Sequence, residues 1–247
     1  MPKPTLILSS RHTDDSQLLW RAAVARGWAV ERTHGWRVPP HLRAVAEPVI
    51  YVEALLAPSV AAELGLALLG PPEDWLPLLP AEYRLRDVRL CTLGQARRAA
   101  GLAFAKPPND KSFPARVYRP QELPDLPDDT AVLVAEPVAW EKEFRCFVLD
   151  REVRTCSVYL RGGALQHEQD FAADEAELAE AAAFAERVLA DGRVELPRAA
   201  VLDVGVIAGR GWAVVEANSA WGAGLYGCDP DKVLDVIRHA AEPLAGG

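Results

Sequence analysis

Cysteine, lysine and long apolar runs are scarce in this sequence, and each scarcity excludes a class of protein. The four cysteines among 247 residues are widely spaced and form no C-x-x-C pair, which argues against a zinc site or a disulfide framework. No stretch reaches the ~18 apolar residues that a membrane-spanning helix needs. The first apolar stretch, 5–8, lies too close to Arg11 to be an export signal. We therefore expect a cytoplasmic protein with reduced thiols and no membrane partner.

Positive charge is also in deficit. Asp and Glu outnumber Lys and Arg by 35 to 27, for a net charge of −8, so a general affinity for a nucleic acid backbone is not expected. Only five lysines stand beside 22 arginines, and two of them, Lys106 and Lys111, are five residues apart. These two lysines are the first candidates for a local anion site. The sequence leaves the oligomeric state open.

The first third of the chain has the pattern of a parallel α/β unit, in which short apolar strands alternate with helices. Strands are expected at 5–9, 28–33 and 48–53, and helices at 14–26 and 54–64. Asp14 or Asp15 is expected to cap the first helix. Gly70-Pro71-Pro72 is a strong break, so we assign residues 1–80 to an N-terminal domain and residues 81–247 to a second domain.

The second domain has strand-like segments in adjacent pairs and two helices, which indicates an α+β fold. Strands are expected at 102–106, 131–136, 144–149, 152–160, 200–207 and 212–218, and helices at 174–190 and 230–241.

The last hairpin predicts a metal site. A turn centred on Gly209-Arg210 places Asp203 directly opposite Glu216, and Asn218 shares their face because side chains alternate along a strand. Two facing carboxylates repel each other, and an unpaired charge among apolar neighbours is costly. A divalent cation between them resolves both problems, and oxygen donors favour Mg²⁺ or Mn²⁺. The alternative is a strand whose polar face lies in water.

Three further groups of residues suggest a nucleotide site. Lys106 ends a strand, and Lys111 and Ser112 follow in the next loop, where cations and hydroxyls can meet phosphates. Glu136 ends the apolar strand 132–135, where backbone groups can meet an adenine edge. Glu143, beyond it, can accept hydrogen bonds from ribose hydroxyls. The alternatives are solvated loop lysines and, for Glu143 with Arg145 on the same face, a surface ion pair worth at most ~1 kcal/mol.

The hairpin that contains Arg145 also bears on the cysteines. A turn at Asp150-Arg151 places Arg145 opposite Cys156. Cys146 and Cys156 then point to opposite faces of the sheet, which disfavours a disulfide between them.

In order and spacing these segments resemble the ATP-grasp superfamily, and more closely its clade named for two arginines and a lysine. The resemblance covers roughly residues 86 to 245, and its motifs lie at 104–107, 110–113, 134–136, 143–150, 202–205, 214–218 and 221–227. It implies two α+β subdomains that sandwich ATP, preceded by an N-terminal α/β pre-ATP-grasp domain.

The resemblance also implies roles for individual residues. Lys106 would contact the α- and β-phosphates, Lys111 and Ser112 would close over them, and Arg145 would face the γ-phosphate or the acyl phosphate made from it. The nucleoside contacts would be Glu136 at adenine and Glu143 at ribose, and the magnesium ligands would be Asp203, Glu216 and Asn218.

The sequence departs from the family pattern in two places. No glycine occurs between Gly101 and Gly162, so Lys111 and Ser112 must replace the usual glycine-rich phosphate loop. Tyr159 stands where proteins similar to ribosomal-protein glutamate ligases have an arginine. Arg161, two residues on and expected on the same face, is the candidate substitute, so that Arg145, Lys111 and Arg161 form the expected catalytic set.

The implied function is an ADP-forming carboxylate–amine ligase that uses ATP and Mg²⁺, with Mn²⁺ as an alternative, and works through an acyl phosphate. Its expected partners are a small-molecule or peptide carboxylate and an amine. Two rival interpretations stay open at this point: a kinase or phosphotransferase on the same scaffold, and an ATP-binding module without turnover.

Overall fold

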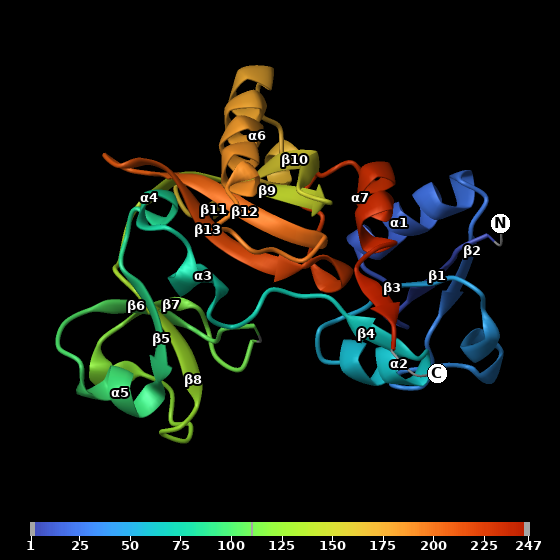
Figure 1. The fold of residues 1–247 in the computed structure, drawn as a ribbon, viewed down its shortest axis with the longest axis horizontal. Coiled ribbons are helices and arrows are strands. Elements are labelled where there is room, and N and C mark those ends of the chain that lie inside the picture. The colour runs from blue at the N-terminus through green and yellow to red at the C-terminus, as the bar shows by residue number, and fades with distance from the viewer. Residues whose placement is uncertain (1–2, 110, 245–247) are drawn as a thin grey trace.

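The computed structural model describes residues 3–109 and 111–244. Its main sheets are a three-stranded parallel sheet near the N-terminus, a four-stranded sheet and a five-stranded sheet. Figure 1 shows the five-stranded sheet in the middle, with the parallel unit on one side and the four-stranded sheet on the other. No helix in the described part of the chain is long and apolar enough to cross a membrane.

The N-terminal unit is a parallel sheet, as the alternating pattern predicted, and its strand order is β2-β1-β3. Its elements are β1 (Thr5–Leu8), α1 (Asp14–Ala25), β2 (Ala29–Arg32), the 3₁₀ turn η1 (Pro40–Ala44), β3 (Pro48–Tyr51) and α2 (Ala57–Glu63). Thr13 caps α1 in a reciprocal capping box with Ser16. The expected cap at Asp14 or Asp15 is therefore wrong, and both acids lie in the first helical turn.

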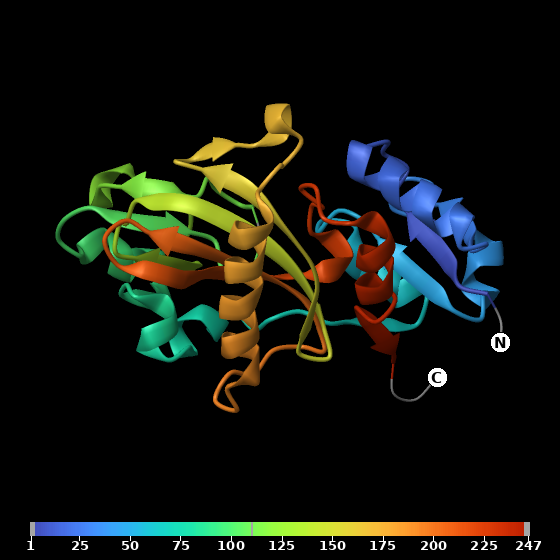
Figure 2. The same ribbon diagram turned by 90° about the horizontal axis from the view of Figure 1, so that it is seen from above.

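The end of the chain returns to this unit. Helix α7 (Pro230–Ile237) packs against α1, and the two helices lie side by side in Figures 1 and 2. Strand β14 (Ala241–Pro243) pairs antiparallel with β4 (Leu66–Leu68), so the helix expected to run to 241 ends at Ile237. Residues of α1, α7 and the five-stranded sheet share one buried cluster, which fixes the N-terminal unit against one end of that sheet.

The four-stranded sheet is antiparallel, in the order β5-β8-β6-β7. The segment from the linker through this sheet comprises α3 (Trp75–Leu78), α4 (Ala81–Arg84), β5 (Val88–Thr92), α5 (Leu93–Arg98), β6 (Ala103–Lys106), β7 (Arg116–Tyr118), η2 (Pro120–Glu122) and β8 (Ala131–Ala135). The sequence pattern indicated β6 and β8 but missed β5 and β7. Both missed strands mix polar and apolar residues without strict alternation, so neither carries a clear strand period.

The five-stranded sheet has the order β11-β10-β9-β12-β13. Its segment contains β9 (Trp140–Leu149), β10 (Glu152–Arg161), β11 (Ala164–Leu165), η3 (His167–Gln169), α6 (Glu175–Ala190), β12 (Ala199–Ile207), β13 (Gly211–Ser219) and η4 (Ala220–Gly222). Helix α6 covers one face, where Phe144, Cys146 and Val148 join its buried side chains. Residues that alternate with these, including Arg145, point to the opposite face.

Strand register confirms one expected pairing and overturns another. Asp203 pairs with Glu216 as predicted, but the turn is one residue off, since Ile207 pairs with Gly211 and an extra residue at Val215 restores the register. In the β9–β10 hairpin the extra residue Arg154 shifts the ladder, so Cys146 pairs with Cys156. Their sulfurs lie 3.2 Å apart as free thiols, and the prediction that they point to opposite faces is wrong.

Candidate active site

Two carboxylates face each other on β12 and β13. Asp203 is completely buried, whereas the Glu216 side chain keeps 26% of its surface exposed. The Asn218 Nδ2 group donates to Glu216 Oε1 at 2.9 Å and to Asp203 Oδ2 at 3.3 Å. The three side chains expected to hold a metal therefore converge on one place, at the point where repulsion between the carboxylates needs compensation.

Arg145 compensates the charge of Asp203. Its Nε donates to Oδ1 at 2.9 Å, its Nη2 donates to Oδ2 at 2.6 Å, and its Nη1 donates to the Gly224 carbonyl at 3.0 Å. The guanidinium also lies over the Tyr226 ring at 4.7 Å and near the Tyr159 ring at 5.4 Å. Since a guanidinium has five N–H groups, two remain for a further anion.

Lys106 compensates the charge of Glu216 from the other sheet. It ends β6, and its Nζ forms an ion pair with Glu216 Oε2. Burial raises the pKa of Glu216, but the Lys106 ammonium and the Asn218 amide outweigh it and bring the pKa to about 2. Burial also raises the pKa of Asp203, against the effect of Arg145. The site thus contains two carboxylates, each paired with one basic side chain, where the two sheets meet.

Glu143 lies beside this cluster in a buried position on β9. Burial raises its pKa to about 7, with the Asp203 and Glu216 charges adding to the rise and a hydrogen bond from Tyr159 opposing it. The Tyr159 hydroxyl donates to Glu143 Oε2 at 2.8 Å. Sequence reasoning treated Tyr159 only as a missing arginine, because nothing in a lone tyrosine indicates a bond across a bulged ladder.

The N-terminal unit contributes two side chains that the sequence did not connect with the site: Tyr51, and Asp15, which was expected only as a helix cap. Asp15 of α1 accepts from the Leu225 backbone N–H at 3.1 Å, and the Tyr51 hydroxyl donates to the Ala223 carbonyl at 3.0 Å. These bonds hold the loop that follows η4, whose Gly224 carbonyl contacts Arg145. An acid in the first turn of a helix ordinarily indicates only a favourable dipole interaction, so no local signal predicted this contact.

The remaining residues expected to bind the nucleotide are Glu136, Lys111 and Ser112. Glu136 follows β8 and pairs with Arg210 at 2.5 Å, while its backbone N–H donates to the Asp87 carbonyl at 2.9 Å. Lys111 and Ser112 are exposed in the loop between β6 and β7. Their neighbour at position 110 lies outside the described residues.

Arg161 is not brought to the site. An extra residue at Tyr159 shifts the β9–β10 ladder, so Arg161 pairs with Lys142. Both side chains then reach Glu177 of α6, and the Arg161 contacts are 2.5 and 3.0 Å. The expectation that Arg161 shares a face with Tyr159 assumed an unbroken ladder and is wrong.

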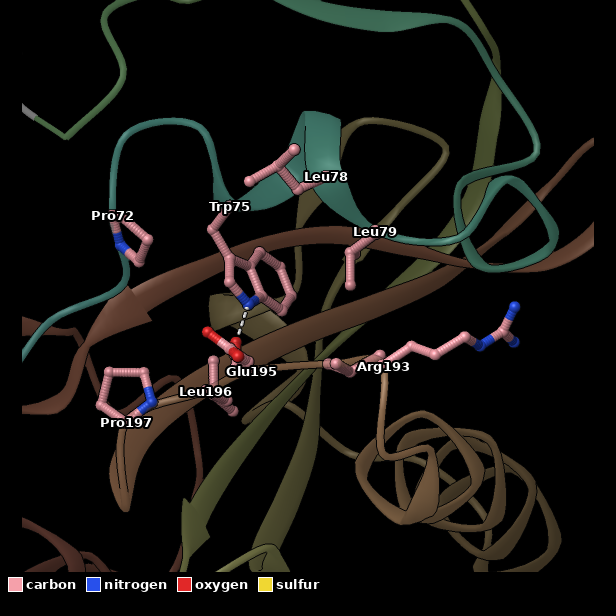
Figure 3. Close-up of a pocket in the computed structure, with 9 residues that line it drawn as sticks. Pro72, Trp75, Leu78, Leu79, Arg193, Glu195, Leu196 and Pro197 are labelled. Carbon is pink, nitrogen blue, oxygen red and sulfur yellow. Dashed lines mark hydrogen bonds between the residues drawn. The ribbon is translucent and has the colours of Figure 1, made fainter.

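Two cavities border the linker that contains α3. The smaller, about 10 Å³, is lined by Lys106, Glu216 and Leu133 among others, and holds at most about one water molecule. The larger, about 390 Å³, lies beyond Trp75 and is lined mainly by apolar side chains of α3 and the segment before β12. Figure 3 shows the Trp75 indole donating to the Glu195 carbonyl in its wall. Neither Asp203 nor Arg145 reaches this larger cavity.

The donor set fits a magnesium ion. Within the described residues no group of three or more His, Cys, Asp or Glu side chains forms a metal site, and beside the two carboxylates the Asn218 amide is the side chain that could offer a third oxygen. Its nitrogen faces both carboxylates here, and a half-turn about its last bond presents the amide oxygen instead. Two carboxylates and an amide oxygen are hard ligands, and Mg²⁺ completes such a set with water and phosphate oxygens.

Comparison with known proteins identifies the family of this chain. A family model for an ATP-grasp domain, the second family of the clade named for two arginines and a lysine, matches residues 83–236, which is more than half of the chain. The chain belongs to this ATP-grasp family. The resemblance seen in the sequence is thereby confirmed, and so is the expected fold.

Several solved structures share the fold of this chain over nearly its whole length. D-cycloserine synthetase DcsG is similar at a TM-score of 0.58 and 15% identity, covering 95% of this chain and 98% of its own. The ATP-grasp ligase PsnB with a minimal precursor gives 0.55 and 16%, covering 96% and 99%. A RimK domain ATP-grasp protein from Sphaerobacter thermophilus gives 0.50 and 19%, covering 94% and 99%. No curated protein sequence matches the chain.

Proposed function

We propose that this ATP-grasp protein is a Mg²⁺-dependent, ADP-forming ligase that joins a carboxylate to an amine through an acyl phosphate. One observation carries the proposal: Asp203 and Glu216 face each other while Arg145 and Lys106 approach them from two sheets. Membership of the ATP-grasp family supports ATP as the nucleotide. The similar solved structures include ligases, which makes ligation the best supported reaction class.

Nucleotide binding requires the cluster to open. The cavity beside Lys106 and Glu216 is far too small for a triphosphate, so Lys106 must release Glu216 and the two sheets must separate. The Lys106 ammonium would then leave the Glu216 carboxylate and contact the α- and β-phosphates of ATP. Lys111 and Ser112, in the exposed loop after β6, would close over the phosphates, while Glu136 and Glu143 would hold adenine and ribose.

The metal would be held by Asp203, Glu216 and Asn218. Bound there, Mg²⁺ would neutralise negative charge on the β- and γ-phosphates. While Lys106 is paired with it, Glu216 has a pKa of about 2 and is ionised at neutral pH, so no proton has to leave before the metal binds. Arg145 stays fixed by Asp203 and by the Gly224 carbonyl, so its two remaining N–H groups have a defined direction.

The proposed ligation has two chemical steps. A substrate carboxylate oxygen attacks the γ-phosphorus, the bond to the β-phosphate oxygen breaks, and ADP leaves with that electron pair. The amine attacks the carbonyl carbon of the acyl phosphate, inorganic phosphate leaves, and the amine loses one proton. Arg145 would stabilise charge on the transferred phosphoryl group in both steps, and it is the only catalytic candidate of the expected three that lies in the carboxylate cluster.

Hydroxylamine trapping tests the proposal. The protein is incubated with ATP, Mg²⁺, hydroxylamine and a panel of amino acids, dicarboxylic acids and short peptides, and hydroxamate and ADP are measured by mass spectrometry. We expect equal amounts of hydroxamate and ADP with at least one acid, and neither with Glu216→Gln. A stable phosphorylated product without hydroxamate would identify a kinase. Tight MgATP binding without any ADP would identify a binding module.

A further inference from the structure

A one-residue bulge decides which way the metal ligands of β13 point. Up to Val204 and Val214 the β12–β13 ladder is regular, and an unbroken ladder would next pair Asp203 with Val215 and Leu202 with Glu216. Leu202 belongs to the apolar cluster under α6, so Glu216 would point into that core. The extra residue Val215 prevents this and turns both Glu216 and Asn218 toward Asp203.

Arg86 holds the bulge. Its Nη1 donates to the Val214 carbonyl at 2.7 Å, and its Nη2 donates to the Val215 carbonyl at 2.8 Å. These are the carbonyls on either side of the point where the ladder breaks, and a bulge leaves such groups without their regular partners. Arg86 lies just before β5, which belongs to the four-stranded sheet. The two guanidinium nitrogens therefore reach β13 from another part of the fold.

The guanidinium is itself held in place. It lies over the Trp140 ring at 4.9 Å, and its Nη1 also donates to the Arg84 carbonyl at 3.1 Å. Trp140 in turn packs on Gly205, where an added Cβ would lie 2.9 Å from the indole and 2.6 Å from the Lys142 carbonyl oxygen. The stack of Gly205, Trp140 and Arg86 therefore leaves the fork little freedom to move.

We propose that Arg86 is a positioning residue for metal binding: by gripping the Val214 and Val215 carbonyls, it keeps Glu216 and Asn218 on the metal-binding face. This inference rests on the proposed function, because it takes those two side chains to be magnesium ligands. Lysine is not an equivalent replacement for Arg86, because its single nitrogen does not reproduce the planar fork whose two nitrogens donate to the two carbonyls.

The test measures metal affinity without turnover. Mn²⁺ binding to the protein saturated with a non-hydrolysable ATP analogue is followed by electron paramagnetic resonance of the free ion. Because residues that orient metal ligands typically contribute 10- to 100-fold to metal affinity, we expect Arg86→Ala and Arg86→Lys to weaken Mn²⁺ binding by ~10- to 100-fold. Affinity for the analogue in EDTA should stay near the wild-type value.

Chemical rescue separates positioning from general damage. Millimolar guanidinium chloride should restore much of the Mn²⁺ affinity of Arg86→Ala, as it can fill the space over Trp140, and should not change the wild type. Arg89→Ala, an exposed arginine on β5, is the matched control and should bind Mn²⁺ normally. Should Arg86→Ala fail to fold, Arg86→Lys decides the question by its Mn²⁺ affinity alone.

Three outcomes are distinguishable. Weakened Mn²⁺ binding that guanidinium restores supports the proposal. Wild-type Mn²⁺ affinity in a folded Arg86 variant overturns it and leaves the proposed function intact. Failure of the wild-type protein to bind Mn²⁺ with the analogue overturns the proposed metal site, and this inference with it.

Discussion

Replacing Glu143 with glutamine should stabilise the protein above neutral pH, although Glu143 is proposed to hold the ribose. The side chain is only 7% exposed, and burial lifts its pKa from the ordinary 4.5 to about 7. The gap between these values corresponds to roughly 3 kcal/mol, at about 1.4 kcal/mol for each pH unit. That is the order of the free energy that the ionised carboxylate costs the folded state.

The sign follows from proton binding. Between about pH 4.5 and pH 7 the folded protein keeps the Glu143 proton while the unfolded chain releases it, so stability falls as pH rises through this window. Glutamine cannot ionise, and its amide oxygen still accepts from the Tyr159 hydroxyl. Glu143→Gln should therefore match the wild type near pH 4 and exceed it by up to roughly 3 kcal/mol near pH 8.

Urea denaturation at several pH values between 4 and 8.5 measures this difference. Glu136→Gln is the matched control, because the Arg210 guanidinium beside Glu136 holds the pKa of that carboxyl below its usual range; the control should lose stability relative to wild type as pH rises. A Glu143→Gln difference that is independent of pH, or that shows destabilisation at pH 8, would mean that burial does not raise the pKa of Glu143. The same variant should bind ATP more weakly, a common exchange of function for stability.

Three further substitutions test separate parts of the site. Lys106→Ala should weaken ATP binding in a calorimetric titration, and unchanged affinity would remove Lys106 from the phosphate site. Asp203→Asn leaves the buried Arg145 without a counter-charge, so chemical denaturation should show a loss of about 3–5 kcal/mol; a loss below about 1 kcal/mol would mean that the pair is effectively solvated. Gly205→Ala forces a Cβ against the Lys142 carbonyl and the Trp140 ring, and should cost about 1–3 kcal/mol of stability; an unchanged Tm would contradict that packing.

Local pattern was enough for the elements with a clear period. The N-terminal parallel unit, the four long strands β9, β10, β12 and β13, and α6 all lie close to their expected ranges. Strand β12 begins with the continuous apolar run Ala199–Leu202, and α6 has a clear cap in Asp174, which accepts from the Glu177 backbone N–H. Strand β7 has no comparable signal in its sequence, and its pairing with β6 defines it.

The pairing of residues across neighbouring strands was the feature that the sequence predicted least well. Counting outward from a turn assumes an unbroken ladder, and a bulge changes every residue beyond it. Arg154 and Tyr159 are such extra residues on β10, which is why Cys156 and Arg161 lie on faces other than those expected. The pairing of Asp203 with Glu216 was predicted correctly because a displaced turn and the Val215 bulge compensate each other.

Contacts between distant segments were beyond local reasoning. Lys106 and Glu216 are 110 residues apart in sequence and meet because two sheets approach each other. The order of motifs suggested this meeting through family resemblance, whereas composition and periodicity did not. Tyr51 had neither kind of signal, and Asp15 was expected only as a helix cap. Their contacts with the loop after η4 depend on how the N-terminal unit packs.

The most direct measurement is a crystal structure with Mn²⁺ and a non-hydrolysable ATP analogue, in which anomalous scattering locates the metal. We expect the manganese peak between the Asp203 and Glu216 carboxylates, with the Asn218 oxygen as a ligand and Lys106 Nζ moved from Glu216 to a phosphate. A manganese peak elsewhere on the nucleotide, with Lys106 still paired to Glu216, would contradict the account.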